Sequence, residues 1–256
     1  MHFALISKIL GLLLVVFSFT MMPPVAVSYW YQEGSEGPFL VSFVITLLLG
    51  LALWLPFFKH KEELQTRDGF LVVTLFWSVL GLIGALPLYI SDDVPVGFTD
   101  AVFESVSGLT TTGATILSGI DFLPKSILFY RQQLQWLGGM GVVVLAVAIL
   151  PMLGIGGMQL YKAEIPGPMK DAKLTPRIAE TAKALWFLYL FITAACALLY
   201  WAAGMTVFDA ICHSFSTVST GGFSTHDASM AYWDNPWIDW TATLFILIGG
   251  LNFALH

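Results

Sequence analysis

Two short polar stretches stand out in a chain that is otherwise strongly apolar. The first reads SGLTTTGATILSG and begins at Ser107, and the second reads STVSTGGFS and begins at Ser216. Neither contains a charged side chain, so they offer hydroxyl groups and a backbone that glycine frees to adopt unusual conformations. Bands of backbone carbonyl oxygens can replace the hydration shell of a monovalent cation. These residue types therefore favour cation binding by main-chain oxygen atoms.

The elements that must position these stretches are membrane spans. The sequence is 57% hydrophobic and only 11% charged, with a mean hydropathy of +0.79, whereas globular chains carry about 25% charged residues. A spanning helix needs roughly 20 mostly apolar residues. Six segments qualify: 8–30, 38–58, 69–90, 128–150, 182–203 and 237–256. We expect an all-α polytopic membrane protein, in which the last span runs to His256 as if it continued in a longer chain.

The first span has a competing interpretation. The run KILGLLLVVFSF could be the core of a signal peptide, with small residues near Ala26–Ser28 for cleavage. Its length and the closely following second span favour a retained helix. The two cysteines, Cys196 and Cys212, lie in or near apolar segments without metal-ligand spacing. We expect both to be small buried hydrophobic residues and not parts of a disulfide or zinc site.

Charges alternate between the connections. Nine of the eleven basic residues fall on one face: Lys8, Lys59, Lys61, Arg67, Lys162, Lys170, Lys173, Arg177 and Lys183. The positive-inside rule places this face and the N-terminus in the cytoplasm. Lys125 and Arg131 are the exceptions, and we expect them to be interfacial anchors, although Arg131 close to the first polar stretch could instead repel extra cations. The net charge of −6 gives no indication of nucleic-acid binding, because the acidic excess lies outside and would concentrate cations there.

The two polar stretches belong to an internal repeat. DAVFESVSGLTTTGAT from Asp100 aligns without a gap on DAICHSFSTVSTGGFS from Asp209, so that Gly113 falls on Gly222. Further on, LGGM matches IGGL after two extra residues in the second copy. Each unit consists of a span, a short helix, a polar glycine stretch and a second span. The predicted domains are an accessory helix pair and two repeats, at 1–68, 69–160 and 161–256.

The charge pattern requires residues 94–127 to leave and re-enter the external face. About 12 residues of helix, capped by Thr99 or Asp100 and ending near Gly108, followed by an extended return, fit a re-entrant segment. Non-helical backbone at membrane depth must be buried in protein or line a water-filled cavity. The helix would also direct the negative end of its dipole into the membrane, which favours a cation.

These paired units, with TTTGAT and STGGFS in filter position, resemble the Trk/Ktr/HKT superfamily of potassium transport proteins. The extra helix pair and the phrase QWLGGMGVVVLAVAILPMLGIGGMQLYKAE resemble the bacterial Trk-type potassium-uptake membrane subunit. The resemblance implies tandem helix–pore-loop–helix repeats related to potassium channels, with filter glycines at Gly113 and Gly222. It implies flanking ion-binding positions at Thr111, Thr112, Ala114, Thr220, Gly221 and Phe223. Potassium would bind the carbonyls of Thr111, Thr112, Thr220 and Gly221.

The resemblance carries further expectations. Family members have four such units per chain, form homodimers in the bacterial inner membrane and bind a cytosolic nucleotide-binding RCK-type subunit that gates them. The basic connections at 59–67 and 162–183 are candidate contacts for that subunit. The filter is simpler than the TVGYG of potassium channels, which implies weaker discrimination of potassium from sodium.

Two other functions compete, and an unselective scaffold or assembly protein is a third, weaker option. A proton- or sodium-coupled symporter needs an ionisable residue in the membrane near the ion path, and Glu104 and His213 are the candidates; His213 is better explained as a hydrogen-bonding residue. A membrane enzyme is the weaker alternative, since His226 beside Asp227 lies in an external connection without a credible nucleophile. The glycine pairs beginning at Gly138 and Gly249 favour close helix packing, with hinge behaviour as the minor alternative.

Overall fold

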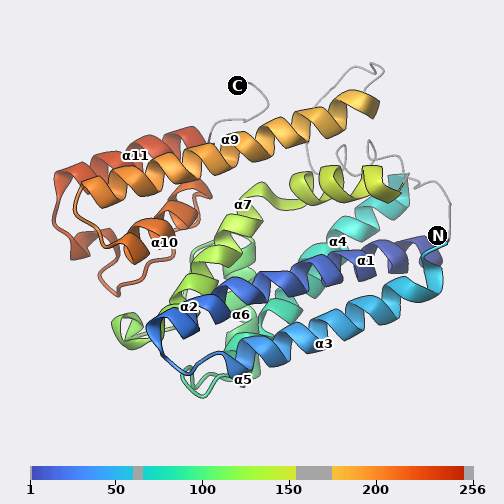
Figure 1. Ribbon diagram of the computed structural model, residues 1–256, viewed down its shortest axis with the longest axis horizontal. Helices are drawn as coiled ribbons and strands as arrows, with labels where there is room; N and C mark the ends of the chain where they lie inside the picture. Colours follow the sequence, from blue (N-terminus) through green and yellow to red (C-terminus); the bar gives the residue numbers. More distant parts are fainter. Residues whose placement is uncertain (1, 60–65, 154–174, 251–256) are drawn as a thin grey trace.

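The computed structural model describes residues 2–59, 66–153 and 175–250 (Figure 1). Within these ranges the protein is entirely helical and has no strand, which confirms the predicted all-α class. The helices are α1 (Phe3–Ser18), α2 (Met22–Tyr31), α3 (Gly37–Trp54), α4 (Thr66–Gly84), α5 (Leu86–Ile90), α6 (Phe98–Leu109), α7 (Lys125–Leu153), α9 (Thr175–Ala202), α10 (Val207–Val218) and α11 (Pro236–Gly250). Short 3-10 turns are η1 (Phe19–Met21), η2 (Leu55–Phe57), η3 (Ile120–Phe122) and η4 (Ser229–Tyr232).

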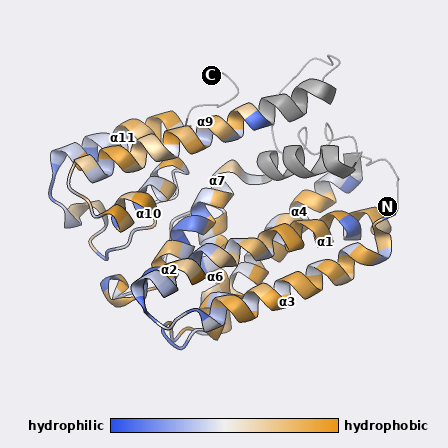
Figure 2. Ribbon diagram, viewed as in Figure 1, coloured by the Kyte–Doolittle hydropathy of each residue, from blue (hydrophilic) through white to orange (hydrophobic). Residues whose placement is uncertain are grey.

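Four helical segments among the described residues are long and apolar enough to cross a bilayer. They are Phe3–Tyr31, Gly37–Phe57, Leu71–Ile90 and Lys183–Ala202, and they coincide with four of the six predicted spans. Figure 2 shows their apolar character along nearly their whole length. The other two predicted spans fall on α7 and α11, and residues 251–256 of the last one lie outside the described part. The chain is therefore a multi-pass membrane protein.

Two long helices near the N-terminus, α1 and α3, pack through glycine. A Cβ atom added to Gly11 would lie 2.7 Å from the carbonyl oxygen of Gly50, and one added to Gly50 would lie 2.7 Å from the backbone nitrogen of Val15. Helices α1 and α3 therefore approach closely, as small residues allow in membrane proteins. The connection that follows α2 also reaches the first repeat, because the Glu33 carboxylate accepts hydrogen bonds from the first two backbone N–H groups of α7. The positive end of the α7 dipole stabilises the negative charge of this carboxylate.

The predicted repeat is present in the backbone. Helices α6 and α10 each contain 12 residues and begin and end 109 positions apart, at the same offset as the sequence alignment. Each lies within a unit that begins with a long helix and ends with another, α4 and α7 in the first and α9 and α11 in the second. The predicted domain boundary after 68 falls inside α4, and the one after 160 lies outside the described residues.

The start of the short helices differs from the sequence expectation. Helix α6 begins at Phe98 with Gly97 as its N-cap, so Thr99 and Asp100 are in its first turn and not at the cap. In the second repeat Thr206 occupies the cap, and its hydroxyl accepts the Asp209 backbone N–H at 3.1 Å. Thr99 and Asp100 are the predicted caps because they are the nearest polar residues. The actual N-cap, Gly97, has no side chain that could identify it in the sequence.

Helix α7 changes direction at one residue. Gly141 has φ 43° and ψ −151°, a conformation outside the helical region, and the ribbon breaks there in Figure 1. The glycine pair that starts at Gly138 serves packing instead: a Cβ atom on Gly138 would lie 1.8 Å from the carbonyl oxygen of Leu109. In the second repeat, a Cβ atom on Gly249 would lie 2.5 Å from the carbonyl oxygen of Val218. The close-packing interpretation is confirmed for both repeats, and the kink at Gly141 lies two residues beyond the predicted pair.

Candidate functional site

The backbone after each short helix takes the same unusual course. Thr111 and Gly113 have φ values of +53° and +73°, and the equivalent Thr220 and Gly222 have +54° and +88°. A positive φ is strained for a threonine, which lacks the freedom of glycine. The same pattern at matching positions of both repeats indicates that the course is specified and not incidental.

Five carbonyl groups in these two stretches have no hydrogen-bond partner in the part of the chain that the structure describes. The carbonyl oxygens of Thr111, Thr112 and Gly113 accept no hydrogen bond from any residue that the structure describes, nor do those of Thr220 and Gly221. Their N–H groups bind the ends of the short helices instead, since Thr112 donates to Ser107 and Gly221 to Ser216. Backbone carbonyls in a protein interior need a partner. The site therefore offers oxygen ligands to an ion or to water.

The two stretches meet at a glycine–glycine contact. A Cβ atom on Gly113 would lie 2.0 Å from the carbonyl oxygen of Gly221 and 3.5 Å from the Cα atom of Gly222. Any side chain at position 113 would collide with the carbonyl oxygen of Gly221, and the positive φ of Gly113 is a second reason why only glycine fits there. The free carbonyls of the two repeats are thus brought side by side.

In each repeat, a side chain of the short helix forms a hydrogen bond with the extended segment that follows it, at the equivalent position. Thr115 donates its hydroxyl proton to Glu104, at 2.8 Å and 3.0 Å from the two carboxylate oxygens. In the second repeat the equivalent atoms are the Nε2 of His213 and the hydroxyl oxygen of Ser224, which lie 3.0 Å apart. Glu104 and His213 therefore bind the segment after the short helix at equivalent positions, one through a carboxylate and the other through an imidazole. The expected hydrogen-bonding role of His213 is confirmed.

Arg131 is not an interfacial anchor, contrary to the sequence expectation. It lies on α7 with none of its surface exposed, and its guanidinium group is 2.8 Å from a carboxylate oxygen of Glu104. The same group donates to the hydroxyl of Thr115 at 3.1 Å and to the carbonyl oxygen of Ser224 at 3.2 Å. Figure 2 shows hydrophilic turns between hydrophobic ones in the first half of α7. A buried arginine requires a counter-charge. Glu104 supplies it through the packing of α6 against α7, which no local sequence pattern indicates.

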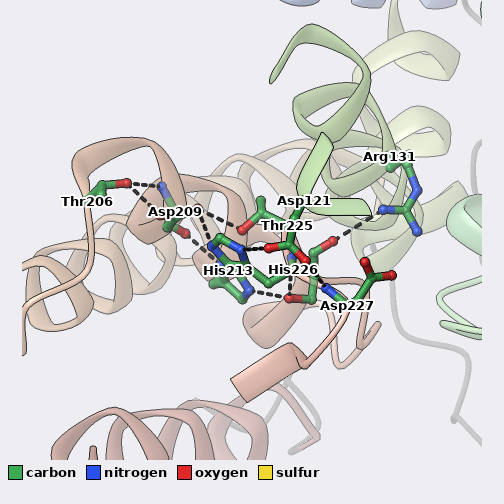
Figure 3. Close-up of polar contacts among 9 residues, drawn as sticks. Asp121, Arg131, Thr206, Asp209, His213, Thr225, His226 and Asp227 are labelled. Atoms are coloured by element: carbon green, nitrogen blue, oxygen red, sulfur yellow. Dashed lines mark hydrogen bonds and ion pairs between the residues drawn. The ribbon is translucent and has the colours of Figure 1, made fainter. Parts of the chain in front are cut away.

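The C-terminal ends of the two stretches are joined by an aspartate–histidine network (Figure 3). Asp121 in η3 accepts hydrogen bonds from the Nδ1 of His226 and, at 3.1 Å, from the backbone N–H of Asp227. The ring of His226 stacks on Tyr232 with 3.6 Å between centroids, and its Nε2 is 3.5 Å from Asp209. The hydrogen bond from His226, followed by that from Asp227, holds the pKa of the Asp121 carboxyl below its usual range.

The expected site residues divide into two groups. The structure leaves Thr112, Ala114, Thr220 and Gly222 exposed and Thr111 and Gly113 half-buried, so they line the open side of the stretches. Gly221 and Phe223 are buried against α7. The carbonyl of Ala114 accepts the hydroxyl of Ser107 at 2.5 Å, which gives this oxygen a partner that its neighbours lack.

Sequence reasoning missed the role of α7 behind the site. Gln135 is fully buried, and its Oε1 accepts the backbone N–H of Phe223 at 3.0 Å. A sequence signal was available, since three consecutive polar residues, Arg131, Gln132 and Gln133, and then Gln135 after Leu134, interrupt an apolar span. Polar side chains in a membrane helix usually face the protein interior. The cysteines behave as expected, because Cys196 and Cys212 are buried and free.

Comparisons with known proteins agree with this architecture. The family profile of TrkH, described as a cation transport protein, matches residues 36–256. The chain is 60% identical over its full length to the Trk system potassium uptake protein TrkH of Vibrio parahaemolyticus and covers 53% of that relative. It is 46% identical to the Trk system potassium uptake protein TrkG of Escherichia coli, over 99% of this chain and 52% of that one. The chain spans about half the length of these curated relatives.

A solved structure supports the fold. The crystal structure of the potassium transporter TrkH from Vibrio parahaemolyticus matches with a TM-score of 0.86 at 55% sequence identity. The match covers 100% of this chain and 51% of that chain. The helical arrangement described above is therefore the arrangement of the N-terminal half of a helical membrane transporter.

Proposed function

The chain belongs to the TrkH family of cation transport proteins, and we propose that it supplies two segments of the selectivity filter of a potassium-uptake protein. Potassium would exchange part of its hydration shell for the carbonyl oxygens of Thr111, Thr112, Thr220 and Gly221. The carbonyls of Ala114 and Phe223 would flank this site. Relatives twice as long are named potassium uptake proteins, which supports the choice of ion.

One observation carries the proposal: unpartnered carbonyls stand in the same register in both repeats and meet at Gly113. Positive φ values at matching positions, +73° at Gly113 and +88° at Gly222, give both stretches the same course. Left-handed residues alternating with others turn successive peptide units, so that carbonyls can face one side. Two matching rows of free oxygen atoms are the arrangement expected of a filter built from repeats.

The driving force is electrical. Helices α6 and α10 end at Leu109 and Val218, within the first residues of the two stretches, so the negative ends of both helix dipoles favour a cation there. Moving one charge through a potential of 100 mV is worth about 2.3 kcal/mol. That energy supports inward movement against a roughly 50-fold potassium gradient, at about 1.4 kcal/mol for each tenfold. Conduction can therefore be channel-like, without a coupled ion.

The remaining proposals come from the family resemblance. We place the protein in the bacterial inner membrane as a homodimer, with its N-terminus in the cytoplasm and an RCK-type nucleotide-binding subunit gating it from that side. Lys59 follows α3 and is exposed, as is Lys183 near the start of α9. The start of α9 and the end of α3 lie at the same end of the molecule, on the right in Figure 1. This common location supports a basic cytoplasmic face.

The coupled symporter is the competing mechanism. Its candidate residues, Glu104 and His213, are each 1% exposed. They form hydrogen bonds with Thr115 and Ser224, in the extended segments that follow the short helices. Both side chains therefore have structural partners, which favours a channel-like pathway. An enzymatic function is also disfavoured, because His226 serves in the network that joins the C-terminal ends of the stretches.

The test is ion selectivity in the full-length protein. Rubidium and sodium uptake are measured in bacteria that lack other potassium-uptake systems, with wild type compared with Gly113→Ser and Gly222→Ser. We expect both substitutions to lower the rubidium-to-sodium uptake ratio. Unchanged ratios would reject the filter assignment. Uptake that rises with external proton or sodium concentration at constant membrane potential would favour the symporter.

A further inference from the structure

We propose that Arg131 and Gln135 are positioning residues that fix the second polar stretch against the first. They lie one turn apart on α7, the last helix of the first repeat, and both contact the stretch of the second repeat. The inference rests on the proposed function, because it assigns these residues to the selectivity of that filter. It makes the first two filter segments one fixed unit.

Gln135 fits into the second stretch from behind. Its Oε1 accepts the backbone N–H of Phe223 at 3.0 Å, and a Cβ atom on Gly221 would lie 2.4 Å from its Cδ. The equivalent of Gly221 in the first repeat is Thr112. A side chain is therefore tolerated at this position in one repeat and excluded in the other. The space it would fill is occupied by Gln135.

Arg131 joins the two stretches directly. It donates to the carbonyl oxygen of Ser224 at 3.2 Å, and its guanidinium carbon lies 4.4 Å from the ring centroid of Phe223. On its other side it contacts Thr115 and Glu104 of the first repeat. A planar guanidinium group with several donors is suited to holding several partners at once. One side chain thus contacts both filter segments.

In the second repeat, apolar residues stand at the positions equivalent to Arg131 and Gln135. The glycine pairs of the two repeats align with an offset of 111, since Gly138 corresponds to Gly249, so the equivalents of Arg131 and Gln135 on α11 are Ala242 and Ile246. Neither of these side chains can form a hydrogen bond. The pair on α7 therefore belongs to the junction between the two repeats and is not a general feature of the repeat.

The test uses the full-length protein and a matched pair of substitutions. Gln135→Met keeps the length and flexibility of the side chain and removes the acceptor for Phe223. Gln133→Met is the control, because Gln133 is also buried on α7 but donates to the carbonyl oxygen of Thr20, away from the filter, at 2.9 Å. Hydrogen–deuterium exchange of the peptide that contains Phe223 is measured together with the rubidium-to-sodium uptake ratio.

We expect Gln135→Met to raise the exchange rate of the Phe223 amide about tenfold and to lower the uptake ratio about tenfold, because a buried N–H group loses its acceptor. Gln133→Met is expected to change both by less than about twofold, since its lost hydrogen bond lies away from the stretch. Arg131→Lys keeps the positive charge beside Glu104 but loses the several planar donors of the guanidinium group. It should therefore lower the rubidium-to-sodium uptake ratio as well.

The outcomes separate the two proposals. Unchanged exchange at Phe223 in Gln135→Met would overturn the positioning role whatever the transport result. Faster exchange with an unchanged uptake ratio, in a wild type that prefers rubidium, would overturn the role in selectivity. If the wild type shows no preference for rubidium over sodium, the proposed function fails, and the exchange measurement still decides whether Gln135 positions the stretch.

Discussion

The ion pair between Glu104 and Arg131 is expected to be the most sensitive point of the described structure. Both side chains are about 1% exposed. The guanidinium Nε and one terminal nitrogen each lie 2.8 Å from a carboxylate oxygen. In Glu104→Gln the charge of Arg131 stays buried without its partner. In Arg131→Met the carboxylate of Glu104 stays buried without its partner.

The magnitude follows from this burial. Removing one member of a buried ion pair costs about 3–5 kcal/mol, mostly because the other charge remains in a medium of low dielectric constant. Each single substitution should therefore lower the free energy of unfolding by about that amount. The double variant Glu104→Gln/Arg131→Met has no buried charge at this place. It loses mainly the hydrogen bond to Ser224, at about 1–3 kcal/mol for a buried carbonyl left without a donor.

The measurement is a double-mutant cycle on the full-length protein in detergent micelles, with unfolding free energies from denaturant titration. We expect a coupling energy of about 3 kcal/mol or more, and a double variant that is more stable than either single variant. Gln133→Met provides the control for loss of a neutral buried hydrogen bond on the same helix. Additivity of the two single effects within about 0.5 kcal/mol would refute the electrostatic reasoning.

Three further expectations concern other parts of the site. Gly113→Ala should lower the rubidium-to-sodium uptake ratio at least about tenfold, because its Cβ atom would lie 2.0 Å from a backbone oxygen; Gly119→Ala, with a similar φ of +70° but only a 3.8 Å contact to a ring carbon, should not change it. The pKa of Asp121 is lowered in the folded state, so its contribution to stability is present at neutral pH and is lost as pH falls below about 3.9; acid titration of Asp121→Asn should lack this component. Cysteine at the exposed position Asp93 should react with a membrane-impermeant thiol reagent from outside, and cysteine at Lys59 only from inside; the reverse pattern would contradict the orientation.

Hydropathy and self-alignment predicted most of the architecture. Long apolar runs indicate spanning helices because the bilayer allows few other structures, and four of those runs are found as such. The gapless alignment of Asp100 with Asp209 predicted the two short helices, whose limits differ by the same 109 positions. Repetition is a strong signal because it does not depend on the propensity of any single residue.

The contacts behind the stretches could not be predicted in the same way. Arg131 looked like an interfacial residue because its sequence position near the start of a span is typical of one. Its burial depends on Glu104, which is 27 residues earlier and reaches it only through the packing of α6 on α7. The restriction at Gly221 likewise depends on a glutamine 86 positions earlier. Such pairs are properties of the fold and leave no local pattern.

The repeat itself nevertheless contains a trace of this contact. Glu104 pairs with Arg131 in the first unit, and the equivalent positions of the second unit are His213 and Ala242. A buried carboxylate requires a counter-charge, whereas a neutral imidazole can hold the Ser224 hydroxyl without one. The two positions therefore have to change together: a carboxylate on the short helix requires a cation on the following long helix, and a histidine does not. Two positions compared across both repeats thus indicate a contact that neither position indicates alone.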